Sequence, residues 1–575
     1  MSRSLRLLLV LTALLLVPGS LGIVMAQGGS IPRGGTVVIN ESPDGNWTAR
    51  NFNPFTAQPL DPTRSLIYEP LIDFNPVDGG APTWVLATAA EYSEDLMQLT
   101  FTLREGVRWS DGEEFNADDL VFTVELIQQF PALDLNGILP LFTSVEKVDD
   151  YTVTFNLTEV YTQADTVLGA TRVVPEHIWR DVEDPVAFLN ENPVATGPMT
   201  EVREYNESVF VVCRNPYYWQ MGEDGQPLPY VDCASYPAYS GNDSVNAALV
   251  SGEVDWTGNF IPDINETFVA RDPEHFGYYF WPEGSPPNFL YFNTTKAPFD
   301  SVNFRYAVSM AVDWEMLLDV VYGPGYSAPV NATGLNPGRY GNWMNPEALA
   351  RAEELGLGQY NPARAEELLD EAGFVRNAEG IRTLPDGTPI RFSIINPNGW
   401  TDWTNSVQFV AQSLQEIGLD ARLETPEFGT WFSSIQNADY DMAMGWAVYG
   451  RTPWDFYRNM LSSDLIIEGP SGLVANGTTW SRWTSEETDR LLADFTRTAD
   501  LQEQIEIVRQ LQMVFVENLP ALAMFANPQW YEWNTQRFVG FPTPDNWYTQ
   551  GSPWNASGAW HVINTIHCVA EGACD

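Results

Sequence analysis

The chain has 575 residues, a formal charge of −47 and an isoelectric point near 4.2. This length predicts two or three lobes rather than one core. The strong acidity excludes nucleic acid, which needs a basic footprint, and an anionic membrane surface as binding partners.

Residues 1–26 have the pattern of a secretory signal peptide. Arg3 and Arg6 precede an apolar run over 7–17, and small residues lead to Ala26. We therefore expect cleavage after Ala26 and export across the cytoplasmic membrane, to the periplasm or the cell surface. An uncleaved anchor stays open as an alternative, because the apolar stretch is about long enough to span a bilayer.

Short runs of alternating apolar and polar residues predict strands at 36–40, 99–109 and 151–157. Helical patterns are interspersed among them, and the last long helix is predicted over 501–519. Helices and strands that mix without strict alternation favour an α/β or α+β architecture.

Several helix starts carry capping signals. Asn116 is predicted to cap a helix, with Asp119 completing a capping box. Asp313 is expected to cap a second helix. Asn361 and the proline after it open a third, which Gly373 ends.

Four cysteines fit an exported protein. The strand-like runs SVFVVC and YVDCASY predict a hairpin that brings Cys213 and Cys233 together, and Cys568 and Cys574 can close the tail. Of the three possible connectivities we expect 213–233 with 568–574; four unpaired thiols are the alternative. The four histidines are scattered, so we expect no metal site, and we expect no cofactor.

Seven stretches follow one another in an order that resembles a known family. They are NFNPF (51–55), YEPLIDFNP (68–76), LREGVRWSDGEEFNADDLVFTVELI (103–127), ATGPM (195–199), SGEVDW (251–256), the segment 292–323 and YNPARAEELLDEAGF (360–374). Together they resemble the extracellular solute-binding proteins of family 5. This is the dipeptide-, oligopeptide- and nickel-binding type that serves ABC importers, and the resemblance covers almost the whole mature chain.

The resemblance implies an α/β, two-lobed fold of the periplasmic-binding-protein type II, with a discontinuous lobe I and an extra subdomain. Lobe I would span 27–290, with the extra subdomain roughly at 60–190. Lobe II would span 291–522, and 523–575 would return to lobe I and form the tail. The family has no hydrolytic activity. It encloses its ligand between lobes that close, and presents it to the ABC permease; we expect a monomer.

The segment MGWAVYGRTPWDFY (444–457) falls where the family makes central ligand contacts. In peptide-binding relatives, Gly-Trp is followed by an acidic residue that pairs with the peptide ammonium. Aligning Gly445 and Trp446 puts Tyr449 at that place, and Asp455 reaches it only with a gap. Because an ammonium buried without a counter-charge is costly, peptide binding should be weakened. Similar TPWxFY segments occur in relatives that bind oligosaccharides.

Aromatic side chains are suited to a sugar, because flat rings stack on the C–H face of a pyranose while polar groups bind its hydroxyls. Burying one large ring against ligand contributes roughly 1.5–3 kcal/mol. Most candidates lie just past predicted strand ends, where open α/β sheets place ligands. The candidate ligand contacts are Gly445, Trp446, Tyr449, Arg451, Trp454, Trp400, Trp403, Trp256, Asn259 and Trp47.

Three functions are compatible with these features. We favour the capture of an oligosaccharide for an ABC importer. The alternative in the same fold is an oligopeptide or dipeptide, held mostly by main-chain pairing. A secreted glycosidase is the third, with Glu253 and Asp255 as a conceivable carboxylate pair.

Overall fold

A computed structural model describes residues 30–574 except 42–48, 57–58, 76, 78–80, 282–285, 324–326, 328–329, 470–471 and 527–528. The predicted signal peptide over 1–26 and Trp47 lie outside the described residues. Among the helices that are described, none combines the length and the apolar character needed to cross a membrane.

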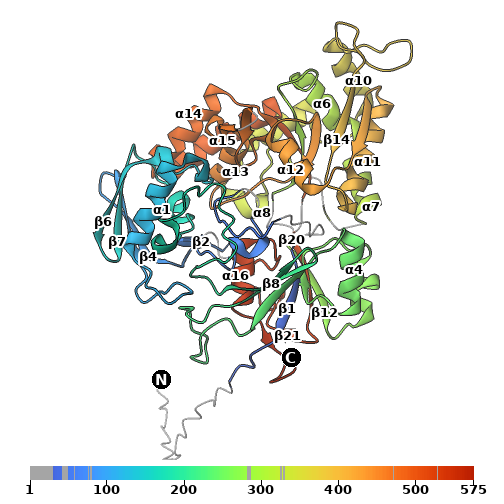
Figure 1. Ribbon diagram of the computed structural model, residues 1–575. Coiled ribbons are helices and arrows are strands. Elements are labelled where there is room, and N and C mark those ends of the chain that lie inside the picture. Colours follow the sequence, from blue (N-terminus) through green and yellow to red (C-terminus); the bar gives the residue numbers. More distant parts are fainter. Residues whose placement is uncertain are drawn as a thin grey trace, which may run out of the picture.

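Two open sheets divide the molecule into two lobes (Figure 1). The sheet of lobe I has seven strands in the order β12-β20-β11-β1-β10-β9-β8, and the sheet of lobe II has five in the order β15-β14-β16-β13-β19. A four-stranded sheet, β4-β5-β7-β6, lies beside lobe I, and we call it the side sheet. Parallel pairing of β1 with β10 and of β14 with β15 and β16 identifies both main sheets as mixed α/β sheets.

The elements have the following bounds. Lobe I contains β1 (Thr36–Asn40), β8 (Met199–Asn206), β9 (Val209–Arg214), β10 (Cys233–Pro237), β11 (Trp256–Thr257), β12 (Phe276–Trp281), β20 (Gln529–Asn534), α4 (Asn242–Ser251), α5 (Ile264–Thr267) and α16 (Ala556–Ile563). The side sheet and its surroundings contain β4 (Ala87–Tyr92), β5 (Gln98–Leu103), β6 (Phe142–Asp149), β7 (Thr152–Leu157), α1 (Ala117–Gln129), α2 (Ala164–Gly169) and α3 (Glu176–Trp179).

Lobe II carries most of the long helices. Its elements are β13 (Asn288–Phe292), β14 (Arg391–Ile395), β15 (Asp420–Glu424), β16 (Met442–Gly445), β19 (Ala521–Phe525), α6 (Val302–Ala311), α7 (Trp314–Val321), α8 (Pro337–Tyr340), α9 (Pro346–Leu355), α10 (Pro362–Glu371), α11 (Thr401–Glu416), α12 (Phe428–Gln436), α13 (Pro453–Leu461), α14 (Glu486–Arg497) and α15 (Leu501–Asn518). The remaining short strand pairs are β2 (Ile72–Phe74) with β3 (Pro82–Trp84), β17 (Ile466–Gly469) with β18 (Gly472–Ala475), and β21 (Phe538–Val539) with β22 (His567–Cys568).

The chain passes between the two main sheets twice. It leaves lobe I after β12 and enters lobe II at β13, then returns from β19 to β20. Because β13 pairs with β19 and β12 pairs with β20, both antiparallel, the two crossovers run side by side. The sequence-based fold class, a two-lobed α/β protein with a discontinuous lobe I, is confirmed.

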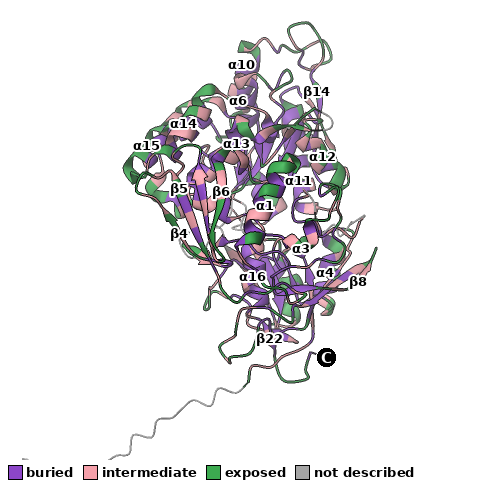
Figure 2. Ribbon diagram, turned by 60° about the vertical axis from the view of Figure 1, so that its left-hand side comes forward, coloured by how far each residue is buried: buried purple, intermediate pink, exposed green. Residues whose placement is uncertain are grey.

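Each lobe buries its own apolar core. The core of lobe II surrounds β13, β16 and β19, all of whose residues are buried. Lobe I and the side sheet share a second core. In Figure 2 the central strands are purple, while exposed residues lie mainly on outer helices and loops. Separate cores allow each lobe to move as a unit.

The predicted capping residues act as caps. The Asn116 side chain accepts from the Asp118 amide and Asp119 closes the capping box of α1. Asp313 accepts from the Met316 amide at the start of α7, and Asn361 caps α10 in the same way. The strand predicted at 99–109 was too long, since β5 ends at Leu103 and the chain then turns.

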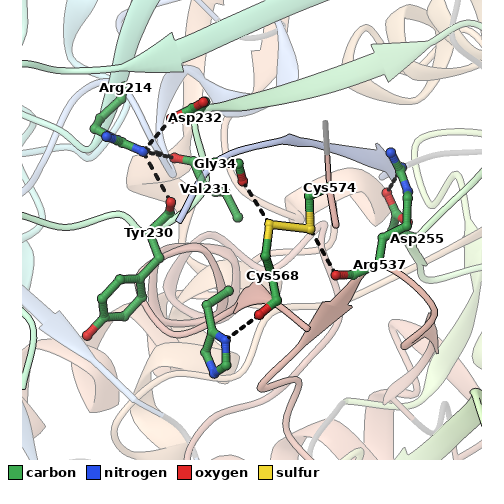
Figure 3. Close-up of a disulfide and its surroundings, with 10 residues drawn as sticks. Gly34, Arg214, Tyr230, Val231, Asp232, Asp255, Arg537, Cys568 and Cys574 are labelled. Atoms are coloured by element: carbon green, nitrogen blue, oxygen red, sulfur yellow. Dashed lines mark hydrogen bonds and ion pairs between the residues drawn. A yellow bond between two sulfur atoms is a disulfide. The ribbon is translucent and has the colours of Figure 1, made fainter. Parts of the chain in front are cut away.

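Both predicted disulfides are present. Cys213 and Cys233 are paired residues of the neighbouring strands β9 and β10, as the predicted hairpin requires. Cys568 and Cys574 join in the tail, between Gly34 and Arg537 (Figure 3). A Cβ on Gly35 would come within 2.3 Å of Cys574 Cβ, so a glycine is required where the tail packs against the start of β1.

Replacing both Cys213 and Cys233 by alanine should lower the free energy of unfolding of lobe I by about 3 kcal/mol, because the bridge spans 20 residues of chain. The same change at Cys568 and Cys574, which are 6 residues apart, should cost about 2 kcal/mol. Urea denaturation followed by tryptophan fluorescence measures both. A larger loss for the tail pair would contradict the loop-length argument.

Candidate ligand-binding site

A cavity of about 300 Å³, which we call cavity 1, lies between lobe II and the part of the chain around the side sheet. From lobe II it is lined by Phe432, Gln436, Trp446, Val448, Asn476, Gly477, Thr478 and Trp480. From the other side it is lined by Pro54, Phe55, Arg64, Ile127, Leu133, Asp134, Leu135, Asn136, Ile138, Ala170, Thr171 and Arg172. Ligand pockets range from about 300 to 1,000 Å³, so cavity 1 is at the small end.

Four half-buried rings of lobe II form an aromatic wall, namely Trp400, Phe428, Phe432 and Trp446. Trp400 follows β14 and Trp446 directly follows β16, and these strands are parallel neighbours, so both rings emerge at the same sheet edge. Phe428 and Phe432 are one helical turn apart on α12. Their planes lie within 14° of the Trp446 plane, at centroid distances of 6.5 and 6.2 Å.

Buried tryptophans pack against the aromatic wall, and one of them, Trp480, also lines cavity 1. Trp403, Trp431 and Trp480 are buried, and the ring of Trp480 meets that of Trp446 edge-on at 5.2 Å. Gly445 makes room for this contact, because a Cβ there would come within 2.8 Å of the Trp480 ring. The structure therefore brings together Trp400, Trp403, Gly445 and Trp446, four of the predicted site residues.

Unused hydrogen-bond donors occur in the wall of cavity 1. Arg172 donates to the carbonyls of Ala170 and Arg64, but its buried Nε–H has no partner among the described residues. The same holds in the described chain for the Thr171 hydroxyl and the Trp480 Nε1–H. Burial, and then Arg172, lower the pKa of Arg64 to about 10, so its guanidinium stays charged near neutral pH. A ligand with strong acceptor oxygens suits these donors.

A second cavity of about 250 Å³, cavity 2, adjoins the first through Arg64, which lines both. Its other lining residues are Glu41, Pro59, Asp61, Ser65, Pro553, Trp554 and Ala556, all from lobe I. Burial and the nearby Asp61 raise the pKa of Glu41 well above its ordinary value. The two cavities therefore differ in their charged groups: cavity 1 is lined by Arg64, Arg172 and Asp134, and cavity 2 by Glu41, Asp61 and Arg64.

Tyr449 does not line either cavity. Its hydroxyl donates to the Gly334 carbonyl at 2.7 Å, and its ring packs against Tyr340 and Phe456 within lobe II. Asp455 is not free to replace a lost acid, because its buried carboxylate accepts from the Thr452 amide and completes the capping box of α13. Neither side chain presents a group to the cavities.

Trp454 and Arg451 contact other parts of the protein. Trp454 is buried, stacks on Phe495 and donates its Nε1–H to the Leu492 carbonyl. Arg451 forms an ion pair with Asp165, which lies across the gap from lobe II. Trp454 is therefore a core residue of lobe II, and Arg451 joins lobe II to the side-sheet region.

Trp256 and Asn259 are buried in lobe I. The sequence places Trp256 just beyond a strand, but it forms the strand β11 itself, because Trp256 and Thr257 pair with Ile39 and Asn40 of β1. Asn259 donates its side-chain amide to Asn242 and Asn246 of α4. Glu253 is exposed whereas Asp255 is buried, so these two do not form the carboxylate pair that a glycosidase needs.

The two lobes touch at the N-terminus of α11. Asn242 of lobe I donates its amide to Thr401 Oγ1 at 3.1 Å and to Asp402 Oδ1 at 3.4 Å. Gly241 and Gly399 meet backbone to backbone, and a Cβ on Gly241 would lie 3.0 Å from Gly399 Cα. A second contact joins the side-sheet region to lobe II, where the Thr162 amide donates to the Thr496 carbonyl. The lobes are thus closed on one another.

Some lining residues were not predicted from the sequence. Phe432, which lines cavity 1, carried a usable signal, since it lies four residues after Phe428 and the two share one face of a helix. Arg172, Thr171 and Ser65 lie in no motif and come to the cavities only through the fold.

Two lobes joined by a pair of adjacent crossovers and enclosing a cavity define a solute-binding protein. The sequence-family model of the bacterial extracellular solute-binding proteins, family 5 (middle region), matches residues 81–466. The chain belongs to this family. Its members are non-enzymatic binding components of ABC transporters, found in the periplasm or at the cell surface.

Similar proteins are known from several bacteria. The di/tripeptide-binding protein 1 of Pseudomonas aeruginosa is 27% identical over 476 residues, which cover 76% of this chain and 79% of that protein. The dipeptide-binding protein of Escherichia coli is 24% identical over 536 residues, covering 87% and 90%. The periplasmic oligopeptide-binding protein of Thermotoga maritima with bound mannohexaose has a TM-score of 0.83 at 25% identity, covering 93% of this chain and 99% of that one.

The contact between Asn242 and Asp402 should depend on pH. Burial raises the pKa of Asp402 to about 6, although hydrogen bonds from backbone amides, Asn242 and Tyr322 oppose this. Above that pH the ionised carboxylate destabilises the closed protein, by an amount on the order of 2 kcal/mol, and the effect is relieved as pH falls below it. Asp402→Asn should therefore melt at a higher temperature than the wild type at pH 7.5, and the difference should shrink by pH 5. A pH-independent difference would contradict this.

Proposed function

We propose that this substrate-binding subunit of an ABC importer captures a short peptide between its lobes and delivers it to the permease. The observation that carries the proposal is the pairing, across cavity 1, of Arg64 and Arg172 with the apolar rings of Trp446 and Phe432. A peptide with a terminal carboxylate and an apolar side chain uses both surfaces.

The arginine side of cavity 1 favours an anionic group. A carboxylate that accepts from the unpartnered Nε–H of Arg172 forms a charge-assisted hydrogen bond, which is about twice as strong as a neutral one. A neutral sugar gains only ordinary hydrogen bonds from the same donors. The names of the relatives from Pseudomonas aeruginosa and Escherichia coli, which bind di- and tripeptides, support the same ligand class.

The sequence-based preference for a sugar rested on the aromatic side chains, on the TPWxFY segment and on Tyr449, which takes the place of an acidic residue. In the fold the Tyr449 hydroxyl donates to the Gly334 carbonyl, and Tyr449 lines neither cavity. The loss of an acid at that position therefore gives no reason to exclude a peptide from these cavities.

An oligosaccharide is the second candidate. It is supported by the aromatic wall, whose nearly parallel rings suit the C–H faces of sugars, and by the mannohexaose bound to the Thermotoga maritima protein. The size of cavity 1, about 300 Å³, favours a short ligand of either class.

Capture would proceed by hinge closure at the two crossovers, with the protein acting as a monomer. Lobe I, lobe II and the tail would follow the boundaries 27–290, 291–522 and 523–575. A ligand stabilises the closed form only by the extra contacts it makes there, so residues from both sides of cavity 1 must touch it.

A panel of di- to pentapeptides and of gluco-, manno- and xylo-oligosaccharides tests the ligand class. At a ligand concentration 100 times the dissociation constant, a bound peptide should stabilise the protein by about 2.7 kcal/mol, which raises the melting temperature by several degrees. Differential scanning fluorimetry of the mature chain measures this. A rise in melting temperature with sugars alone would contradict the peptide proposal and support an oligosaccharide ligand.

Arg172→Gln tests the carboxylate contact. For a peptide that binds the wild type, this change should lower the affinity by roughly tenfold or more, because a charged hydrogen bond is lost. The C-terminal amide of the same peptide should bind both proteins almost equally in isothermal titration calorimetry. Arg180→Gln, at an exposed arginine of the α3 region paired with Glu176, is the matched control. Equal losses for acid and amide would contradict the assignment.

A further inference from the structure

We infer that cavity 2 is the subsite that binds the positively charged amino end of the ligand. This inference rests on the proposed peptide function and locates the ammonium in lobe I, away from the Tyr449 position in lobe II. The acceptors come from Glu41, Asp61 and Ser65, and the indole ring of Trp554 lies beside them.

Three separate chain segments build cavity 2. Glu41 directly follows the last residue of β1, and Asp61 and Ser65 come from the segment that leads into the core of lobe I. Trp554 lies just before α16, near the end of the chain. Its ring packs closely against Gly258, where a Cβ would come within 2.6 Å of Trp554 Nε1. The fold therefore presents these groups in a defined arrangement.

Two polar atoms of cavity 2 are buried without a hydrogen-bond partner among the described residues. They are Oε1 of Glu41 and Oγ of Ser65, and the Ser65 side chain belongs to a residue only 7% exposed. Buried acceptors are costly when they stay unpaired, and nearly all in native proteins find a donor. A ligand that carries N–H donors would supply the kind of partner that each of these atoms lacks.

Cavity 2 has two acidic side chains, Glu41 and Asp61, together with the cationic Arg64, and its acidic side favours a cation. Glu41 and Asp61 repel each other, and the raised pKa of Glu41 reports this repulsion together with burial. A cation between them relieves the repulsion and restores the ionised form of Glu41. The indole of Trp554, a residue 43% exposed, offers a ring face that attracts an ammonium group.

An organic ammonium fits cavity 2 better than a metal ion does. Within the described residues, no group of three or more metal-ligating side chains occurs. The lining also includes the aromatic ring of Trp554, which supplies no oxygen ligand for a metal ion. Because Arg64 lines both cavities, a ligand with its ammonium in cavity 2 and its carboxylate in cavity 1 is a short zwitterion.

The test compares the tightest-binding di- or tripeptide of the panel with its N-acetyl derivative, which lacks the ammonium. In calorimetry, Glu41→Gln should weaken the binding of the free peptide by roughly ten- to hundredfold, because the ammonium loses one charged partner. Binding of the acetylated peptide, already weak, should change by about twofold or less, because it has no charge to lose. Trp554→Leu, which removes the ring face but no charge, should also weaken the binding of the free peptide more than that of the acetylated peptide.

The control is Glu354→Gln, at an exposed acid of α9 that pairs with the surface residue Arg351. It should leave both affinities unchanged, and the melting temperatures of all variants confirm folding. If the wild type binds peptides but Glu41→Gln and Trp554→Leu affect free and acetylated forms equally, the subsite is overturned while the proposed function stands. If the wild type binds no peptide, both the proposed function and the cavity 2 subsite are contradicted.

Discussion

The fold depends on antiparallel pairing at two neighbouring crossovers. β12 pairs with β20 in lobe I, and β13 pairs with β19 in lobe II, so the chain enters and leaves lobe II at one place. Each lobe closes its own apolar core on either side of this junction. Because the strongest packing lies within lobes, the surfaces between them are available for ligand, and relative motion of the lobes disturbs few buried contacts.

The surfaces that meet across the gap are chemically unlike. Lobe II contributes the rings of Phe432, Trp446 and Trp480, and the opposite side contributes Arg64 and Arg172 together with the acidic side chains of cavity 2. A ligand enclosed here loses water from every group, so each of its charges needs a partner of opposite sign. This requirement, more than the number of rings, decides between a zwitterionic peptide and a neutral sugar.

The contacts that join the two lobes are modest. Asn242 reaches Thr401 and Asp402 from lobe I, and Arg451 reaches Asp165 from lobe II. Ion pairs that remain partly solvated contribute only up to about 1 kcal/mol each, and burial of the ionised Asp402 works against closure. Such weak contacts leave the balance between open and closed forms to the ligand, as a binding protein for an importer requires.

The sequence by itself determined the features that depend on neighbours along the chain. Asn116, Asp313 and Asn361 cap their helices because a cap needs only the next turn. The β9–β10 hairpin fixed the Cys213–Cys233 bridge in the same local way. The order of motifs also determined the two-lobed fold class.

Only the tertiary structure decided which side chains share a cavity. It turned Tyr449 toward Gly334, buried Trp454 against Phe495, and brought Arg172 and Trp480 together from positions 308 residues apart. The physical reason is that a site between lobes is built from residues distant in sequence, whose directions follow from packing and leave no local pattern.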